Sequence, residues 1–163
     1  MLNLISRMSG VATRTGEFAL RIPDRSAARL YDTRKTTPGW RGLEKYAVRC
    51  GGGASHRIGL YDAVLLKDNH LASLPGGGVR GRLEDGARGA RSAHELRFFG
   101  VEVDSLAQLD AVLGVEPGLV DVVMLDNFTL EDLKRGVALR DELAPGVALE
   151  ASGGVTLETI GAI

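Results

Sequence analysis

Two kinds of apolar pattern alternate along the chain, helical spacing and short continuous runs. In residues 3–22 apolar side chains recur at three- and four-residue steps, which predicts a helix with an inner face made of Leu4, Met8, Val11, Thr15, Phe18 and Ile22. The Thr-Thr-Pro-Gly segment at 36–39 breaks the chain, and a second helix is predicted to follow it. The three glycines at 51–53 would end that helix, and its inner face would consist of Leu43, Tyr46, Ala47 and Cys50.

Five short segments have the composition of strands, namely 28–33, 63–67, 98–104, 121–125 and 147–152. The run at 63–67 is continuously apolar, which is typical of a strand covered on both faces. Further helices are predicted at about 79–93, from Thr129 to about 142, and after Gly153-Gly154. A capping box at Ser105–Gln108 predicts the start of another helix, with Leu106, Leu109 and Leu113 facing inward. Five β–α repeats with short links predict parallel strands joined by right-handed crossovers.

Either an α/β barrel or an open doubly wound sheet would fit this order of elements. No Gly-x-Gly-x-x-Gly segment follows a strand, which weighs against a dinucleotide-binding fold. Polar side chains gather where each of the five strands ends, and in a barrel the carboxyl ends of the strands build the active site. The pattern therefore favours a barrel, with residues 1–163 forming one partial catalytic domain.

Composition and charge narrow the possible partners. The 163 residues suffice for one domain, and the single Cys50 forms no internal disulfide, which fits a reducing cytoplasm. No apolar run approaches the roughly 18 residues of a membrane span, and the first residues do not resemble a signal peptide. Residues 1–97 carry 17 basic and 9 acidic side chains, whereas residues 98–163 carry 3 and 12. The basic half suggests an anionic partner, and the low aromatic content argues against nucleic acid.

Three segments offer cations to such a partner. Arg34 and Lys35 follow the first predicted strand in a loop rich in hydroxyls, and His56 and Arg57 lie in a glycine-rich loop at 51–59 whose backbone could approach an anion. Lys67 ends the apolar strand, where a lysine needs a partner or a ligand. The alternatives are an ordinary polar loop, a structural histidine and, for Lys67, an ion pair with Asp68.

Carboxylates and a glycine turn end the later strands. Glu102 and Asp126 suit Mg²⁺, which prefers oxygen ligands and keeps several waters, although they could simply balance the basic side chains. The segment Ser152-Gly153-Gly154 lies between a strand and a predicted helix N-terminus, an arrangement that binds anions, with simple turn glycines as the alternative. Together these groups suit a polyanionic phosphate substrate with magnesium.

The segment DTRKTTPGWRGLEKYAVRCGGGASHRIGLYDAVLLKDNH at 32–70 closely resembles the quinolinate phosphoribosyltransferase family, also called carboxylating nicotinate-nucleotide pyrophosphorylase. Residues 101–113, 122–128 and 149–160 resemble it too. The resemblance implies an irregular α/β barrel with fewer than eight strands, incomplete in this chain, beside a separate N-terminal domain. It implies a Mg²⁺-dependent reaction of quinolinate with phosphoribosyl pyrophosphate that yields nicotinate mononucleotide, pyrophosphate and CO₂ in de novo NAD synthesis, by a cytoplasmic homodimer.

The resemblance also implies roles for individual residues. The two quinolinate carboxylates would be held by Arg34, His56, Arg57 and Lys67, and phosphoribosyl pyrophosphate by Lys35. Positions near the ribose hydroxyls and the metal match Glu102 and Asp126, and the cradle of the ribose 5-phosphate matches Ser152 and Gly153. The groups expected to take part in catalysis are Lys67, Glu102 and Asp126.

The sequence departs from the family at several places. Gly100 stands where the family usually has the first glutamate of a Glu-Val-Glu-Val run, and the stretch 73–100 is glycine-rich. Lacking the N-terminal domain and the last barrel strands, this chain alone is expected to be inactive or nearly so. The alternatives are a truncated or divergent non-catalytic homologue that binds anionic ligands, and a related group associated with molybdenum transport.

Overall fold

The computed structural model describes residues 1–24, 26–67 and 78–163. The chain divides into two compact units. One, here the helical unit, comprises Met1–Gly59 and Thr156–Ala162, and the other, the sheet unit, comprises Leu60–Val155 with Ile163. None of the described helices is both long enough and apolar enough to cross a membrane.

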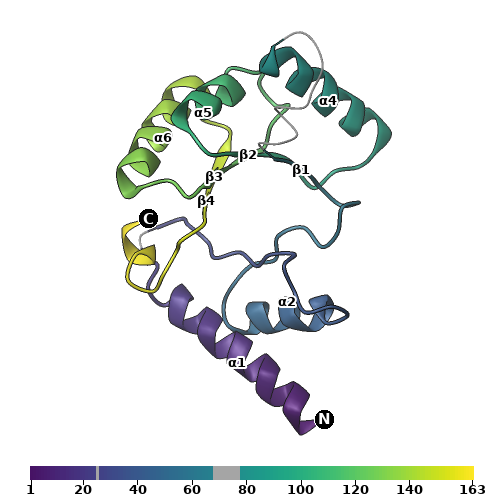
Figure 1. Ribbon diagram of the computed structural model, residues 1–163, viewed down its shortest axis with the longest axis vertical. Helices are drawn as coiled ribbons and strands as arrows, with labels where there is room; N and C mark the ends of the chain where they lie inside the picture. The colour runs from purple at the N-terminus through teal and green to yellow at the C-terminus, as the bar shows by residue number, and fades with distance from the viewer. Residues whose placement is uncertain (25, 68–77) are drawn as a thin grey trace. The chain divides into compact units, whose positions relative to one another are not determined.

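The helical unit contains α1 (Leu2–Ala19), α2 (Arg41–Cys50) and the short 3₁₀ helix η1 (Ile160–Ala162) (Figure 1). The inner face predicted for the first helix is confirmed at the five residues that lie on α1, which are all buried or half-buried while most of their neighbours are exposed. The helix ends three residues earlier than predicted, so the sixth, Ile22, lies beyond it, where it is half-buried. The glycines after α2 allow it to pack closely on α1. A Cβ on Gly51 would lie 2.7 Å from the Cβ of Thr15, and one on Gly53 would lie 3.0 Å from its Cγ2.

The inner face predicted for α2 is confirmed only at Ala47 and is wrong at its other three positions. Leu43, Tyr46 and Cys50 are exposed, and the buried positions are Lys45 and Ala47. Burial of a lysine is possible here because its ammonium group forms an ion pair with Asp32, whose side chain is equally buried. The apolar pattern alone therefore selected the wrong side of this helix.

The strand predicted at 28–33 is reduced to a single parallel bridge between Tyr31 and Ala54. Two backbone hydrogen bonds frame it, from Ala54 N to Leu30 O and from Asp32 N to Ala54 O. This pairing holds the segment that leads to Arg34 beside the segment that leads to His56.

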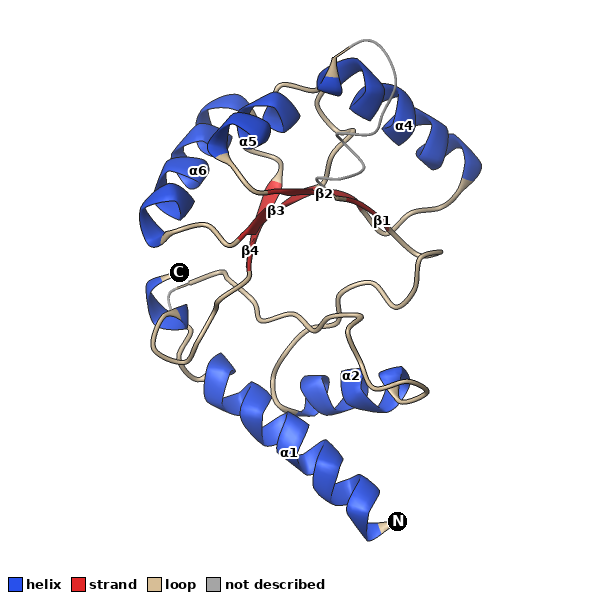
Figure 2. Cartoon of the chain, in the orientation of Figure 1, coloured by secondary structure: helices blue, strands red, loops and turns tan. Residues whose placement is uncertain are grey.

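The sheet unit alternates strands and helices in the order β1 (Val64–Leu66), α4 (Val79–Ala93), β2 (Phe99–Val103), α5 (Leu106–Leu113), β3 (Val122–Asp126), α6 (Leu130–Leu143) and β4 (Ala148–Ser152). The four strands are parallel and neighbours in the sheet are neighbours in the sequence. Figure 2 shows α4, α5 and α6 on one side of this open sheet. A doubly wound sheet carries helices on both faces, so the observed winding is that of a barrel segment, as predicted.

The core of the sheet unit lies between the strands and these helices. Alternate strand residues Val101, Val103, Val123 and Leu125 are almost fully buried and pack with Leu109 and other apolar side chains of α4 and α5. Because side chains alternate across a strand, the residues between them, Glu102 among them, lie on the opposite face. That alternation sends the polar side chains of β2 and β3 away from the core.

Of three predicted helix starts, one is confirmed and two differ from the structure. Thr129 caps α6 as predicted, with its Oγ1 accepting a hydrogen bond from Asp132 N at 3.1 Å. Ser105 makes no such bond, and Gln108 Oε1 accepts from Asp104 N rather than from Ser105 N, so neither bond of the predicted capping box is formed. No α-helix starts directly after Gly153-Gly154; turns lead to the 3₁₀ helix η1, so the helix predicted to start there is not formed.

Candidate functional site

The strand register of the sheet unit places four predicted site residues along one edge. Glu102 pairs with Met124 and Asp126 pairs with Ser152, while Lys67 directly follows Leu66, the partner of Val101. All four side chains therefore lie at the carboxyl ends of the strands, on the face opposite the core. This is the location at which a barrel carries its functional groups.

Lys67 and Glu102 form an ion pair across β1 and β2. The Nζ of Lys67 donates to both carboxylate oxygens of Glu102, at 2.9 and 3.1 Å. The lysine side chain is 45% exposed and the glutamate 14%. The alternative partner considered for this lysine, Asp68, lies outside the described residues, as do Asn69 and His70. The ion pair thus fixes a half-exposed ammonium against a half-buried carboxylate at the ends of the two strands.

Asp126 and Ser152 form the second pair of this edge. Ser152 Oγ donates to Asp126 Oδ1 at 2.7 Å, and Asn127 Nδ2 donates to Asp126 Oδ2 at 2.9 Å. The backbone N of Asn127 donates to Ser152 O, which extends the β3–β4 pairing by one bond. Asn127 and Gly153 both have left-handed φ, 56° and 78°, so both strands turn at the same level.

The remaining predicted residues lie in the helical unit around the carboxylate of Asp32. That carboxylate accepts the backbone N–H of His56 at 2.9 Å and the ion pair from Lys45. The ring of His56 lies edge-on to Tyr31, with centroids 6.2 Å apart. Arg57 is buried, at 8% exposure. The Asp32 carboxylate therefore joins the histidine segment to the loop that carries the predicted cations Arg34 and Lys35.

Arg34 and Lys35 differ in their surroundings. Lys35 is exposed, and its backbone N–H donates to Thr33 Oγ1 at 2.8 Å. Arg34 is half-buried, and its buried Nε has no hydrogen-bond partner within the described part of the chain. A buried guanidinium nitrogen without a partner is costly, and a bound anion would satisfy it.

The glycines at 51–53 do not form the predicted anion cradle. Their backbone N–H groups donate to Ala47, Val48 and Arg49 carbonyls and so end α2. These glycines serve packing and helix termination, because side chains on Gly51 and Gly53 would collide with α1 and α2.

Comparison of the sequence with known protein families identifies the family to which the chain belongs. The sequence pattern of the quinolinate phosphoribosyl transferase C-terminal domain matches residues 11–163. The chain belongs to this family.

Relatives and solved structures agree with the family assignment. The chain is 47% identical over 158 residues to the carboxylating nicotinate-nucleotide pyrophosphorylase of Mycobacterium leprae, covering 97% of this chain and 52% of that protein. The human protein of the same name is 40% identical over 166 residues, covering 98% and 51%. The structure of the nicotinate-nucleotide pyrophosphorylase from Francisella tularensis superposes with a TM-score of 0.80 at 40% identity, covering 96% and 51%. The chain thus spans about half the length of the relatives it matches.

The carboxylates of this family member fit Mg²⁺ only as part of a larger ligand set. Among the described side chains, no group of three or more His, Cys, Asp or Glu is placed to hold a metal ion. Glu102 and Asp126 each already accept hydrogen bonds from the protein. Mg²⁺ is commonly held by one or two carboxylates together with substrate phosphates and waters, and these two residues suit that mode.

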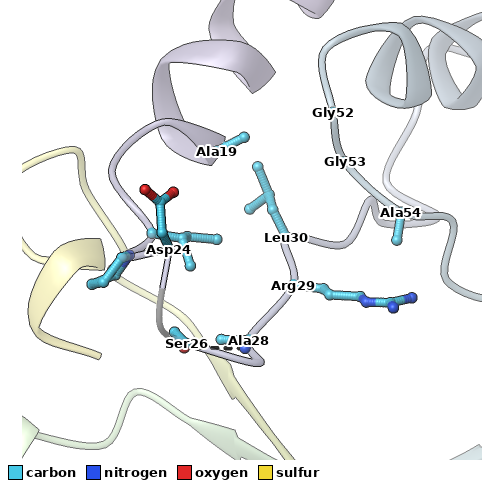
Figure 3. A pocket seen from close by; sticks show the side chains of 11 residues that line it. Ala19, Asp24, Ser26, Ala28, Arg29, Leu30, Gly52, Gly53 and Ala54 are labelled. Atoms are coloured by element: carbon cyan, nitrogen blue, oxygen red, sulfur yellow. Dashed lines mark hydrogen bonds between the residues drawn. The ribbon is translucent and has the colours of Figure 1, made fainter.

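A cavity of about 410 Å³ in the helical unit is lined by residues from the end of α1, the segment after it and the glycines after α2 (Figure 3). Its lining includes Ala19, Asp24, Arg29 and Leu30 together with Gly52 of the glycine-rich loop, and none of the predicted cations or carboxylates takes part. This cavity is therefore not the candidate site.

Sequence reasoning missed Lys45 and Asn127. A lysine in a polar helix gives no sign of burial, and only its pairing with Asp32 shows it. Asn127 carried a usable signal, since Asn adopts left-handed φ more readily than most residues and follows a strand here.

Proposed function

We propose that the chain forms the catalytic half of a quinolinate phosphoribosyltransferase. The reaction would join quinolinate to phosphoribosyl pyrophosphate and release pyrophosphate and CO₂, giving nicotinate mononucleotide for NAD synthesis. The observation that carries this proposal is the 47% identity to a carboxylating nicotinate-nucleotide pyrophosphorylase over 97% of the chain. The ion pair of Lys67 with Glu102 at the strand ends supports it.

The cations would bind the two carboxylates of quinolinate. The proposed contacts are Arg34, His56, Arg57 and Lys67. The unpartnered Nε of Arg34 and the half-exposed ammonium of Lys67 support this assignment. Four such groups exceed the need of one carboxylate, so quinolinate should bind more tightly than nicotinate.

Phosphoribosyl pyrophosphate would be held by a different set of residues. Lys35, Ser152 and Gly153 are proposed to contact its phosphates, with Glu102 and Asp126 near the ribose hydroxyls. Mg²⁺ bound with these carboxylates would neutralise charge on the departing pyrophosphate. The pyridine nitrogen would form a bond to the anomeric carbon as the bond to pyrophosphate breaks. Fixed carboxylates would stabilise the positive charge that develops on the ribose.

The assembly of the whole protein is part of the same proposal. The chain spans about half the length of its relatives, and a further polypeptide region is proposed to complete the site. The proposed assembly is a homodimer. A cytoplasmic location would fit an enzyme of this pathway with a single free cysteine.

A chimera tests the proposed function directly. The matching half of the Mycobacterium leprae relative is replaced by this chain, and the product is assayed for nicotinate mononucleotide and CO₂ from quinolinate and phosphoribosyl pyrophosphate. We expect turnover, and isothermal titration should show quinolinate bound more tightly than nicotinate. A folded chimera without turnover, or with equal affinity for the two acids, would contradict the proposal.

Site variants separate binding from chemistry. Glu102→Gln should lower turnover and the Mg²⁺ dependence while quinolinate still binds. Full activity in the Glu102→Gln, Asp126→Asn double variant would refute the carboxylate assignment. Exposed Glu142→Gln on α6 provides the matched control.

A further inference from the structure

We propose that helix α2 is a positioning element, in which Lys45 and Glu44 hold the two ends of the loop that carries Arg34 and Lys35. The loop is defined here as residues 32–37. The assignment of a ligand to this loop rests on the proposed function, whereas the clamp itself rests on contacts within the helical unit.

Lys45 fixes the start of the loop. It is 3% exposed, and its ammonium is ion-paired with Asp32, which lies at the first position of the loop. The same ammonium donates to the carbonyl of His56 at 3.4 Å, and Asp32 Oδ1 accepts the His56 N–H at 2.9 Å. One buried pair thereby joins α2, the loop and the histidine segment.

The geometry of this pair matters more than its stability. A buried ion pair can often be replaced by apolar residues without loss of stability, because desolvation offsets the attraction. What apolar residues cannot reproduce is the directed bonding to the backbone of His56. The pair therefore specifies where two cation-bearing segments lie relative to each other within this unit.

Glu44 fixes the end of the loop. Its Oε2 accepts the backbone N–H of Thr37 at 3.1 Å, and its Oε1 accepts the Thr37 hydroxyl at 2.6 Å. From α1, Arg7 donates to Thr37 Oγ1 at 2.7 Å and reaches Glu44 Oε1 at 3.4 Å. The hydrogen bonds from Thr37, followed by those from Arg7, hold the pKa of Glu44 below its ordinary value. The carboxylate is thus ionised at neutral pH and accepts all of these bonds.

The two anchors leave a short connection between them. Consecutive helix positions point about 100° apart, which lets Glu44 and Lys45 reach different ends of the loop. Inside it, Lys35 N donates to Thr33 Oγ1 and Thr36 N donates to Arg34 O, at 2.8 and 2.9 Å. A loop already ordered in the free protein loses less conformational freedom when an anion binds.

Binding measurements on the chimera used to test the proposed function also test the clamp. Glu44→Ala removes both acceptors and should weaken quinolinate binding about ten-fold, while Glu44→Gln, which keeps one acceptor, should recover part of that loss. The double variant Lys45→Met, Asp32→Asn leaves no unpaired buried charge and should also bind about ten-fold more weakly. Exposed Glu142→Ala and Lys134→Met on α6 are the matched controls and should bind as the parent does.

Amide exchange provides a readout that needs no ligand. In Glu44→Ala the amides of Lys35 and Thr36, whose own bonds lie inside the loop, should exchange about ten-fold faster, while amides of α6 keep their parent rates. Unchanged exchange at these two amides overturns the clamp, as does a lower melting temperature with unchanged quinolinate affinity. Faster exchange in Glu44→Ala, together with a parent chimera that folds but binds no quinolinate, leaves the clamp standing and refutes the proposed function.

Discussion

Replacing Gly153 by alanine tests the account of the strand ends most directly. Gly153 has φ of +78°, in the left-handed region that favours glycine. A Cβ at this position would overlap the side chain of Asn127, lying 2.6 Å from its Cγ, and would lie 3.0 Å from the Asn127 backbone N. Both the backbone conformation and the space therefore exclude a side chain.

The two costs can be estimated separately. An L-residue in the left-handed conformation costs about 1–2 kcal/mol, and forced overpacking typically costs about 1–3 kcal/mol. Gly153→Ala should therefore lower the free energy of unfolding by roughly 2–5 kcal/mol. Gly154 has φ of +64° but nothing within 4 Å of its ideal Cβ. Gly154→Ala should show only the backbone cost, about 1–2 kcal/mol.

Urea unfolding followed by circular dichroism measures these differences, with an unchanged slope required for comparison. Gly146→Ala, at a position with neither a left-handed φ nor a neighbour within 4 Å, is the control and should change little. Adding Asn127→Gly to Gly153→Ala should recover about 1 kcal/mol or more of the loss, beyond additivity. The reasoning is wrong if Gly153→Ala costs no more than Gly154→Ala, or if the double variant shows no coupling.

Three further outcomes are expected. The hydrogen bonds from Thr37 lower the pKa of Glu44, so the stabilisation by this carboxylate is present above its ordinary pKa of 4.5 and is lost as the pH falls below that value. Glu44→Gln should therefore reduce the loss of urea-measured stability at acid pH. An unaltered dependence of stability on pH would contradict this. Gly100→Ala should lower the free energy of unfolding by about 1–3 kcal/mol, because its Cβ would lie 3.0 Å from Val122 Cγ1. Gly100→Glu should lower it further, and unchanged urea midpoints would disprove this packing. Thr129→Ala should cost about 1 kcal/mol, while Ser105→Ala should stay within about 0.5 kcal/mol in thermal unfolding; equal losses would mean that the two caps do not differ.

Much of the sheet unit followed from the sequence. The strands at 98–104, 121–125 and 147–152 were predicted to within one or two residues, and the helix at 79–93 matches α4 (Val79–Ala93). These elements have strong local patterns, and their cores are formed by the helix and strand faces that the patterns define. The placement of polar side chains at strand ends follows equally from the alternation of parallel strands and helices.

The helical unit depended on contacts that sequence patterns do not encode. The segment 28–33 has strand composition, yet only Tyr31 pairs, because a strand needs a neighbour and its composition does not say which one is present. The burial of Lys45 was equally hidden, since a lysine is normally solvated and becomes buried only where a partner such as Asp32 meets it.

The sequence by itself determined the family, the βα order and the residue types at the strand ends. Only the tertiary structure decided which polar side chains become partners: Lys67 with Glu102, Asp126 with Ser152, and Asp32 with Lys45 of helix α2. The physical reason is that hydrophobic spacing reports which face of an element is buried, whereas a polar contact depends on register and on distances between segments far apart in the chain.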